Sequence, residues 1–172
     1  MKNERYSVRQ LAGIAGGELL PLNPDAAYVS HLLTDSRKIV SPESSLFFAI
    51  RGDRYDGHDF IEELRAKGVC NFVVSGHFRQ ERLRAPSNLI VVDNPLQALQ
   101  KIAAWHRARF TIPVIGITGS NGKTIVKEWL SQLLHADHNI IRSPKSYNSQ
   151  VGVPLSVWGM DESHSLAIFE AG

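Results

Sequence analysis

The residues whose types and spacing most clearly suggest chemistry lie in one glycine-rich stretch, Thr118-Gly119-Ser120-Asn121-Gly122-Lys123-Thr124. The apolar run before it, residues 114–117, predicts a buried strand, and a helical pattern begins directly after it. In such an arrangement the backbone N–H groups of the loop and of the helix N-terminus point at a bound anion. We therefore predict that this stretch holds the phosphates of a nucleotide, with Lys123 against the β- and γ-phosphates and the Thr124 hydroxyl on Mg²⁺.

The loop is a variant of the common phosphate-binding pattern G-x-x-x-x-G-K-[ST], because the first glycine of that pattern would fall at Ile117. Gly119 and Gly122 instead allow the backbone to close on the phosphate oxygens. A Gly-Lys-Thr sequence can also occur by chance in a surface turn, but the strand before it and the helix after it favour phosphate binding. The predicted nucleotide-binding residues are Thr118, Gly119, Ser120, Asn121, Gly122, Lys123 and Thr124.

A second candidate group is the carboxylate of Glu170, which follows the apolar run 166–169. That run predicts a buried strand, and the carboxyl ends of parallel strands open into the crevice where α/β sheets bind ligands. A carboxylate there could complete a Mg²⁺ shell directly or through water, although a strand-end glutamate can also simply face solvent. We predict Thr124 and Glu170 as metal ligands, and Lys123 and Glu170 as catalytic residues.

The elements that would position these groups follow from hydrophobic periodicity and capping signals, which include N-caps at Ser7 and Asn94 and a helix stop at Gly16. Helices are predicted at 7–15, 59–67, 94–109 and 123–135, and strands at 28–33, 46–50, 69–75, 89–92, 114–117, 139–142 and 166–169. Strands alternating with helices over short connections indicate an α/β fold. We place a domain boundary at about Arg109, after the third helix.

Composition describes an ordinary globular chain, with 43% hydrophobic and 21% charged residues over a length that suits one domain or two small ones. The first residues, 1–5, do not resemble a signal peptide and no apolar run could span a bilayer, which predicts a cytoplasmic protein without membrane insertion. The basic cluster of Arg79, Arg82 and Arg84 lacks interleaved aromatic residues, so we expect no nucleic-acid partner. Cys70 is the single cysteine, which excludes an internal disulfide, and its apolar neighbours predict a buried thiol.

The glycine-rich stretch resembles the ATP loop of the Mur ligases, the family that builds the peptide stem of bacterial peptidoglycan. Residues 33–37, 46–52 and 56–60 resemble, in the expected order, segments of the N-terminal UDP-binding domain of that family. The resemblance implies a small α/β domain at 1–109 that binds a UDP-muramoyl-peptide. It also implies that residues 110–172 begin a P-loop, doubly wound parallel-sheet domain that binds ATP and Mg²⁺.

The same resemblance implies a set of substrate-binding residues in the first domain. These are Asp35, Ser36, Arg37, Arg51, Gly57 and His58. Taken without the resemblance, Asp35-Ser36 would be an ordinary Asx-type turn and Asp56-Gly57 an ordinary tight turn. His58 by itself would more often make structural hydrogen bonds than take part in binding.

Residues 147–155 resemble the segment that contacts substrate near the ATP site of the Mur ligases, and Asn148 matches it as a substrate-binding residue. Ser149 stands where the family usually has a second asparagine, and Gln150 where it has an acid, so neither is predicted to bind substrate. These departures suggest a divergent branch. The chain is similar to a bifunctional form in which the ligase is fused ahead of an alanine racemase, so a C-terminal racemase fusion is expected.

The implied activity is that of the branch that joins D-Ala-D-Ala to UDP-MurNAc-tripeptide, with both molecules as substrates. ATP would phosphorylate the tripeptide carboxylate, the dipeptide amine would attack the acyl phosphate, and Lys123 and Mg²⁺ would stabilise the developing charge. Residues 110–172 offer roughly three strands, fewer than a doubly wound domain needs. We therefore expect an incomplete ATP-binding domain and no turnover by this chain without further polypeptide.

Two alternatives remain open at the level of sequence. A folylpolyglutamate synthase-like ligase has a similar loop, but usually carries Gly-Lys-Gly where this chain has Gly122-Lys123-Thr124, and it lacks the Asp-Ser-Arg domain. The other alternative is a UDP-sugar or nucleotide-binding module that performs no chemistry. Titration with the muramoyl nucleotide and with Mg-ATP would distinguish them.

Overall fold

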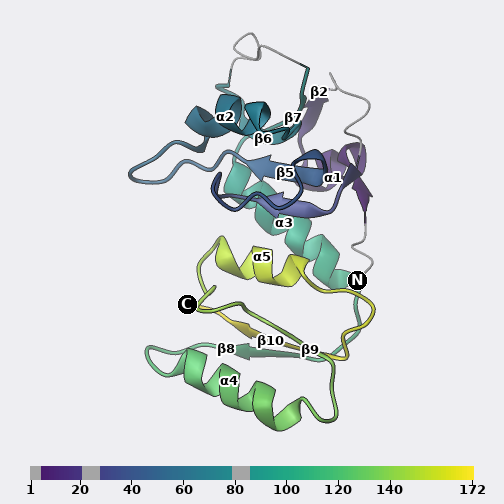
Figure 1. Cartoon of the computed structure of the whole chain (residues 1–172), viewed down its shortest axis with the longest axis vertical. Coiled ribbons are helices and arrows are strands. Elements are labelled where there is room, and N and C mark those ends of the chain that lie inside the picture. The colour runs from purple at the N-terminus through teal and green to yellow at the C-terminus, as the bar shows by residue number, and fades with distance from the viewer. Residues whose placement is uncertain (1–4, 21–27, 79–85) are drawn as a thin grey trace. The chain divides into compact units, whose positions relative to one another are not determined.

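The computed structural model describes residues 5–20, 28–78 and 86–172, which belong to two compact units, residues 1–102 and 103–172 (Figure 1). The division falls within helix α3 (Pro95–Ala108), and the predicted boundary at Arg109 follows the last residue of that helix. The basic cluster at residues 79–84 lies outside the described residues. Within the described part of the chain, no helix has the length and apolar character needed to cross a membrane.

The first unit contains a five-stranded sheet with the strand order β2-β7-β6-β5-β4. Its strands are β2 (Glu18–Leu20), β4 (His31–Leu33), β5 (Ser45–Phe48), β6 (Asn71–Ser75) and β7 (Asn88–Val92). All neighbours pair in parallel except β2, which joins β7 antiparallel. The predicted α/β class is therefore confirmed, because parallel neighbours need helical or long crossovers between them.

The predicted strand at 28–33 is divided in two. Its first part, β3 (Tyr28–Val29), pairs antiparallel with β1 (Tyr6–Ser7), whereas β4 pairs in parallel with β5. Ser30 lies between them, and its N–H donates to the Ser44 carbonyl at 2.9 Å. The segment thus changes partners at one residue, which hydrophobic periodicity cannot reveal.

Two of the three predicted helices between residues 5 and 108 begin at their predicted caps, and the other is divided in two. The Ser7 hydroxyl accepts the Gln10 N–H at 3.1 Å at the start of α1 (Val8–Ala15), and Gly16, at φ 72°, ends it. The predicted helix at 59–67 is a 3₁₀ turn, Gly57–Phe60, followed by α2 (Ile61–Ala66). The carboxamide oxygen of Asn94 caps α3.

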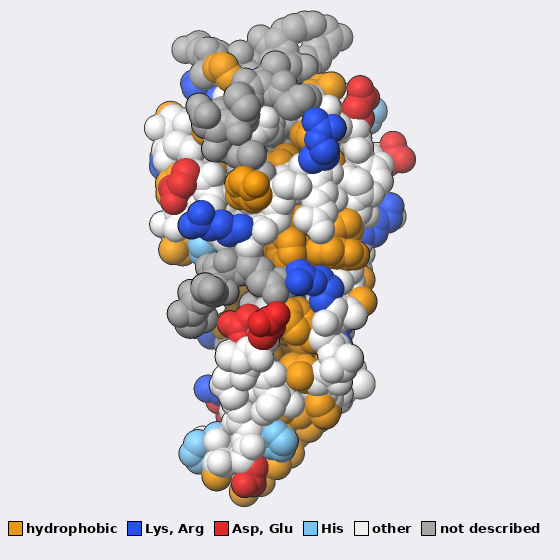
Figure 2. All heavy atoms as spheres, turned by 90° about the vertical axis from the view of Figure 1, so that its right-hand side faces the viewer, with side chains coloured by type: hydrophobic (Ala, Val, Ile, Leu, Met, Phe, Trp, Pro, Cys, Tyr) orange, Lys and Arg blue, Asp and Glu red, His pale blue; other side chains and the backbone are white. Residues whose placement is uncertain are grey.

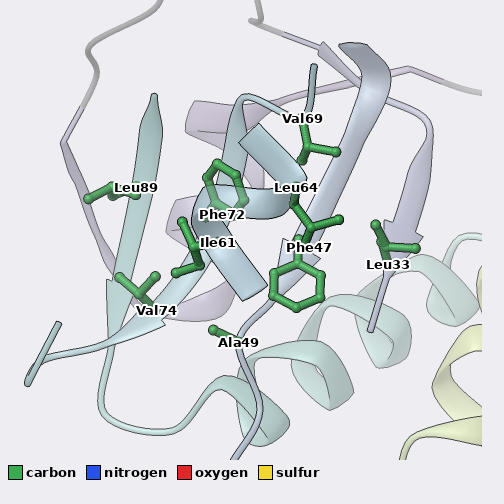
Figure 3. Close-up of a cluster of buried hydrophobic side chains, with 9 residues drawn as sticks. All are labelled: Leu33, Phe47, Ala49, Ile61, Leu64, Val69, Phe72, Val74 and Leu89. Carbon is green, nitrogen blue, oxygen red and sulfur yellow. The ribbon is translucent and has the colours of Figure 1, made fainter. Parts of the chain in front are cut away.

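A cluster of buried side chains holds α2 against the sheet of the first unit (Figure 3). The cluster consists of Leu33, Phe47, Ala49, Ile61, Leu64, Val69, Phe72, Val74 and Leu89. Phe47 and Phe72 meet edge to face with ring centroids 6.3 Å apart. Cys70, beside this cluster, is only partly buried, so the prediction of a buried thiol was wrong. The cluster fixes the carboxyl ends of β4 and β5, where the predicted substrate loops begin.

The second unit is a three-stranded parallel sheet with the strand order β8-β10-β9, as expected for the start of a doubly wound domain. Its elements are β8 (Val114–Ile117), α4 (Lys123–Leu134), β9 (Ile140–Arg142), α5 (Gly152–Trp158) and β10 (Leu166–Glu170). Figure 1 shows α4 and α5 on opposite faces of this sheet. The register of β10 and β8 places Glu170 opposite Ile117, the residue before the glycine-rich loop.

The second unit buries fewer apolar side chains than the first. Its core cluster contains Met160, Ala167 and Phe169. Helix α4 leaves Ile125, Trp129 and Leu133 57%, 65% and 75% exposed, and because they are spaced by four residues they share one helix face. Hydrophobic side chains also reach the surface on the face of the molecule drawn in Figure 2.

Candidate functional site

The glycine-rich loop connects β8 to α4, as the sequence predicts, and residues 118–122 are exposed. Gly119 has φ 134° and Gly122 has φ 78°, conformations that residues with a Cβ rarely adopt. A Cβ added at either position would meet no atom within 4 Å, so backbone conformation and not crowding requires glycine there. Lys123 donates to the Gly119 carbonyl and thereby closes the loop.

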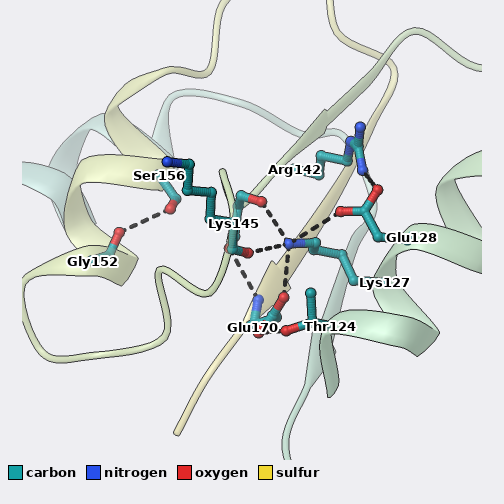
Figure 4. Close-up of polar contacts among 9 residues, drawn as sticks. Thr124, Lys127, Glu128, Arg142, Lys145, Gly152, Ser156 and Glu170 are labelled. Atoms are coloured by element: carbon teal, nitrogen blue, oxygen red, sulfur yellow. Dashed lines mark hydrogen bonds and ion pairs between the residues drawn. The ribbon is translucent and has the colours of Figure 1, made fainter. Parts of the chain in front are cut away.

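The carboxylate of Glu170 is fully buried and faces the first turn of α4 (Figure 4). The Thr124 hydroxyl donates to Glu170 Oε2 at 3.1 Å. Glu170 Oε1 lies 2.7 Å from the Nζ atom of Lys127. The two predicted metal ligands, Thr124 and Glu170, are therefore in direct contact although 46 residues separate them.

Sequence reasoning missed Lys127, whose side chain is fully buried beside Glu170. Its ammonium donates to the Ser143 carbonyl at 2.8 Å and to the Lys145 carbonyl, and the Glu128 carboxylate lies 3.4 Å away. One signal was present, because Lys127 follows Thr124 by three residues and so shares its helix face. Lysines are almost never fully buried unless they are paired, and the sequence does not show a partner for Lys127. From sequence alone, Lys127 would therefore be expected at the surface.

The segment 143–148 lies along the end of β10. The Ser143 hydroxyl accepts the Glu170 N–H at 3.1 Å, and the Asn148 carbonyl accepts the Gly172 N–H at 3.0 Å. Asn148, the predicted substrate residue of this unit, is thereby placed at the same strand end as Glu170. Lys145, within the segment, has φ 51°, an uncommon conformation for a residue other than glycine.

The donor set at the strand end fits Mg²⁺. A hydroxyl and a carboxylate are hard oxygen ligands, and Mg²⁺ commonly takes one or two carboxylates together with waters and substrate phosphates. Within the described residues no group of three or more His, Cys, Asp and Glu side chains could hold a metal. Glu170 Oε1 makes no well-aligned hydrogen bond, and the Lys127 ammonium at 2.7 Å balances its charge. Oε2 is the oxygen that faces Thr124.

Two family models match the chain in sequence, and both describe Mur ligases. The model "Mur ligase family, catalytic domain" matches residues 28–107, and "Mur ligase middle domain" matches residues 117–172. The chain belongs to the Mur ligase family. The resemblance inferred from the glycine-rich loop and the Asp-Ser-Arg segment is confirmed.

Individual Mur ligases match nearly the whole chain but are much longer. The chain is 37% identical to UDP-N-acetylmuramoyl-tripeptide–D-alanyl-D-alanine ligase of Synechocystis sp. over 142 residues, which cover 83% of this chain and 30% of that protein. A crystal structure of MurF from Acinetobacter baumannii matches all of this chain and 37% of its own, with a TM-score of 0.85 and 26% identity. MurF from Thermotoga maritima in complex with ADP matches 81% of this chain and 31% of its own, with a TM-score of 0.67 and 27% identity. The chain thus spans about a third of the length of these relatives.

The first unit of this Mur ligase chain brings four of the predicted substrate residues to one pocket. Asp35, Ser36, Arg37 and Gly57 all line it, and its volume is about 570 Å³. Asp35 accepts hydrogen bonds from the Arg37 guanidinium at 2.9 Å to each of its two oxygens. This side-chain hydrogen bonding outweighs burial and lowers the pKa of Asp35 to about 2. The carboxylate is therefore charged at neutral pH.

The other two predicted substrate residues of the first unit, Arg51 and His58, line a second pocket of about 480 Å³. The His58 Nδ1 atom lies 2.5 Å from Asp56 Oδ1, and its Nε2 accepts the Ser75 N–H at 3.1 Å. Burial raises the pKa of Asp56, but hydrogen bonds from the His58 backbone and ring together lower it below its usual value. Both ring nitrogens of His58 are thus engaged within the protein, so the ring holds the loop to the end of β6.

Proposed function

We propose that the full-length protein is an ATP-dependent ligase that joins D-alanyl-D-alanine to UDP-N-acetylmuramoyl-tripeptide. The observation that carries the proposal is the contact between Thr124 and Glu170 directly behind a phosphate-binding loop. Relatives from several bacteria carry the name of this activity. The Gly122-Lys123-Thr124 sequence and the Asp-Ser-Arg segment of the first unit argue against a folylpolyglutamate synthase-like enzyme.

In this proposal the second unit binds ATP. The N–H groups of the loop and of the first turn of α4 donate hydrogen bonds to the phosphates, and Lys123 exchanges the Gly119 carbonyl for phosphate oxygens. Thr124 and Glu170 hold Mg²⁺, which supplies charge neutralisation for phosphoryl transfer. The T. maritima relative with ADP supports nucleotide binding by this fold.

The first unit in this proposal binds the UDP end of the muramoyl substrate at the pocket of Asp35, Ser36, Arg37 and Gly57. A Cβ at Gly57 would lie 2.7 Å from the Ile50 backbone nitrogen, so the close approach of these two loops requires glycine. Arg51 offers a guanidinium that is 79% exposed, suited to a diphosphate. Asn148, which lies at the same strand end as Glu170, contacts the substrate in the second unit.

The reaction proceeds in two steps. The tripeptide carboxylate attacks the γ-phosphorus of ATP, the bond to the β–γ bridging oxygen breaks, and an acyl phosphate forms as ADP leaves. The amine of D-Ala-D-Ala then attacks the acyl carbon, and inorganic phosphate leaves as the amide forms. Lys123 stabilises the charge on the transferring group, and the loop N–H groups orient it.

The test is phosphate release by the protein at its full natural length, measured with ATP, UDP-MurNAc-tripeptide and D-Ala-D-Ala together and with each omitted in turn. We expect turnover only with all three, and a loss of about 10²–10³-fold in kcat for Lys123→Ala. Lys67→Ala, which removes an exposed lysine paired with Glu63, is the matched control and should leave kcat unchanged. Turnover with a folate and glutamate, or binding of the muramoyl nucleotide without phosphate release, would replace the proposal with one of its alternatives.

Three further parts of the proposal concern the whole protein. The 172-residue chain assayed without further polypeptide is expected to show no ligation. The reaction is proposed to take place in the cytoplasm. An alanine racemase is proposed to follow the ligase in the same polypeptide, and the reading frame downstream of Gly172 tests this directly.

A further inference from the structure

A buried lysine that phosphate binding does not require lies in the second unit. Lys127 has no exposed surface, although it is only four residues beyond the half-buried lysine that follows the loop, Lys123. An ammonium group has three N–H donors. Here hydrogen bonds run to the Ser143 and Lys145 carbonyls, and the Glu170 carboxylate lies 2.7 Å from the ammonium as an ion pair. Because the side chain is fully buried and its charge is paired, Lys127 does not duplicate the phosphate-binding role predicted for Lys123.

The partners of Lys127 come from two separate parts of the chain. Glu170 ends β10, whereas Ser143 and Lys145 both lie in the loop that follows β9 (Figure 4). Lys145 adopts its positive φ of 51° at the point where its carbonyl meets the ammonium. The carboxylate of Glu128, the residue after Lys127, pairs with the Arg142 guanidinium at the end of β9. This ion pair is a second contact between α4 and the end of that strand.

We propose that Lys127 is a positioning residue that sets the orientation of the Glu170 carboxylate toward the cation site. The proposal rests on the proposed function above. Lys127 takes Oε1, so Oε2 is the oxygen presented to the Thr124 hydroxyl. By holding the 143–145 carbonyls with the same ammonium, it also places the segment that leads to Asn148 at that strand end.

The physical reason is that a buried carboxylate with no fixed partner either turns toward water or takes up a proton. Groups that orient metal ligands without touching the metal change metal affinity by about 10–100-fold when they are removed. Loss of Lys127 should therefore weaken the contribution of Mg²⁺ to nucleotide binding. It should leave the contacts between the loop N–H groups and the phosphates in place.

The test compares ADP binding with and without Mg²⁺ by calorimetry, on the full-length protein and its Lys127→Met variant. We expect ADP affinity without metal to stay within about twofold, and the apparent affinity for Mg²⁺ in the ternary complex to fall by about tenfold or more. The matched control is Met160→Ala, which opens the core cluster of the same unit without touching Glu170. It should lower the melting temperature but keep the wild-type response to Mg²⁺.

If Lys127→Met does not fold, as judged by circular dichroism, Lys127→Arg decides the question. A planar guanidinium keeps the charge but cannot reproduce the same three contacts, so the variant should fold and still lose at least part of the Mg²⁺ response. A wild-type Mg²⁺ response in the folded Met or Arg variant would overturn this inference and leave the proposed function standing. Failure of the wild-type protein to bind ADP under either condition would overturn both.

Discussion

The two units of the chain differ in whether the ion pair at their predicted site is buried or exposed to solvent. In the second unit Lys127 and Glu170 form an ion pair in which both side chains are 0% exposed. In the first unit the pair of Arg37 and Asp35 is 85% and 24% exposed. An exposed pair is screened by salt and solvent and adapts to a ligand, whereas a buried pair keeps one geometry because leaving it is costly. The pair of Lys127 and Glu170 is therefore expected to keep one geometry, whereas the pair of Arg37 and Asp35 can rearrange.

The units also differ in how they use apolar side chains. The first buries Phe47, Phe72 and Leu64 in one cluster beneath α2. The second leaves an apolar face of α4 exposed, including Leu133. Stability in the first unit therefore depends mainly on packing, while in the second a larger share depends on the buried polar contacts around Glu170. Four comparisons between variants test this contrast, from the largest expected effect to the smallest.

Glu170→Ala should have the largest effect, because it leaves the Lys127 ammonium buried without its counter-charge. Breaking a buried pair by removing one partner costs about 3–5 kcal/mol. Urea unfolding followed by tryptophan fluorescence measures it, since Trp105, Trp129 and Trp158 all lie in the second unit. Glu162→Ala, at an exposed position, should change the free energy of unfolding by less than about 0.5 kcal/mol. Equal losses for the two variants would contradict the contrast between buried and exposed charge.

Leu64→Ala and Leu133→Ala make the same chemical change on helices of the two units. Leu64 is 0% exposed in the first unit, so its loss should cost about 2–5 kcal/mol of unfolding free energy. Leu133 is 75% exposed, and its loss should cost no more than about 0.5 kcal/mol. Hydrogen exchange of amides in β6 and in α4 reports on each unit separately. A large cost at Leu133 would show that the exposed face of α4 is packed in solution.

Gly122→Ala should cost about 1–2 kcal/mol, because alanine at φ 78° places its Cβ against the neighbouring carbonyl oxygen. Gly116→Ala is the control within the same unit, since a Cβ there meets no atom within 4 Å and the residue has no positive φ. Thermal unfolding of both variants checks the prediction. Equal stability of the two would mean that the loop does not keep its left-handed conformation.

Arg37→Ala should have the smallest effect on stability, smaller than that of Gly122→Ala, because the Arg37 guanidinium is largely exposed and solvent screens its charge. The pKa of Asp35 is lowered from 3.8 to about 2 in the folded protein, so the pair stabilises the fold above pH 3.8 and ceases to do so as the pH falls through about 2. In the variant the pKa should rise toward 3.8, and the stability difference from wild type should vanish between those two values. Carboxyl NMR titration measures the pKa directly. Lys38→Ala, which removes the weakest of the contributing charges, should shift it less.

Much of the fold and part of the site could be predicted from local patterns. The Ser7 and Asn94 caps and the Gly16 stop occur where the sequence predicts them, because capping depends on residues adjacent in the chain. The strand at 28–33 was predicted as one piece, since periodicity is blind to a change of pairing partner at Ser30. The proximity of Thr124 and Glu170 was predicted from the rule that strand ends meet at one edge of a parallel sheet.

The sequence by itself determined the family, the α/β class and the glycine-rich loop with Lys123 and Thr124, because each depends on residue types at short, fixed spacings. Only the tertiary structure decided that Lys127 is buried against Glu170, and that both ring nitrogens of His58 are engaged by Asp56 and Ser75. Apart from the contact between His58 and Asp56, which lie two residues apart in one turn, these contacts join residues from different elements, and the sequence carries no local sign of them. These side chains become buried only when the folded sheet brings the ends of its strands together. A buried charge without a partner is energetically costly, so the folded structure pairs the Lys127 ammonium with the Glu170 carboxylate.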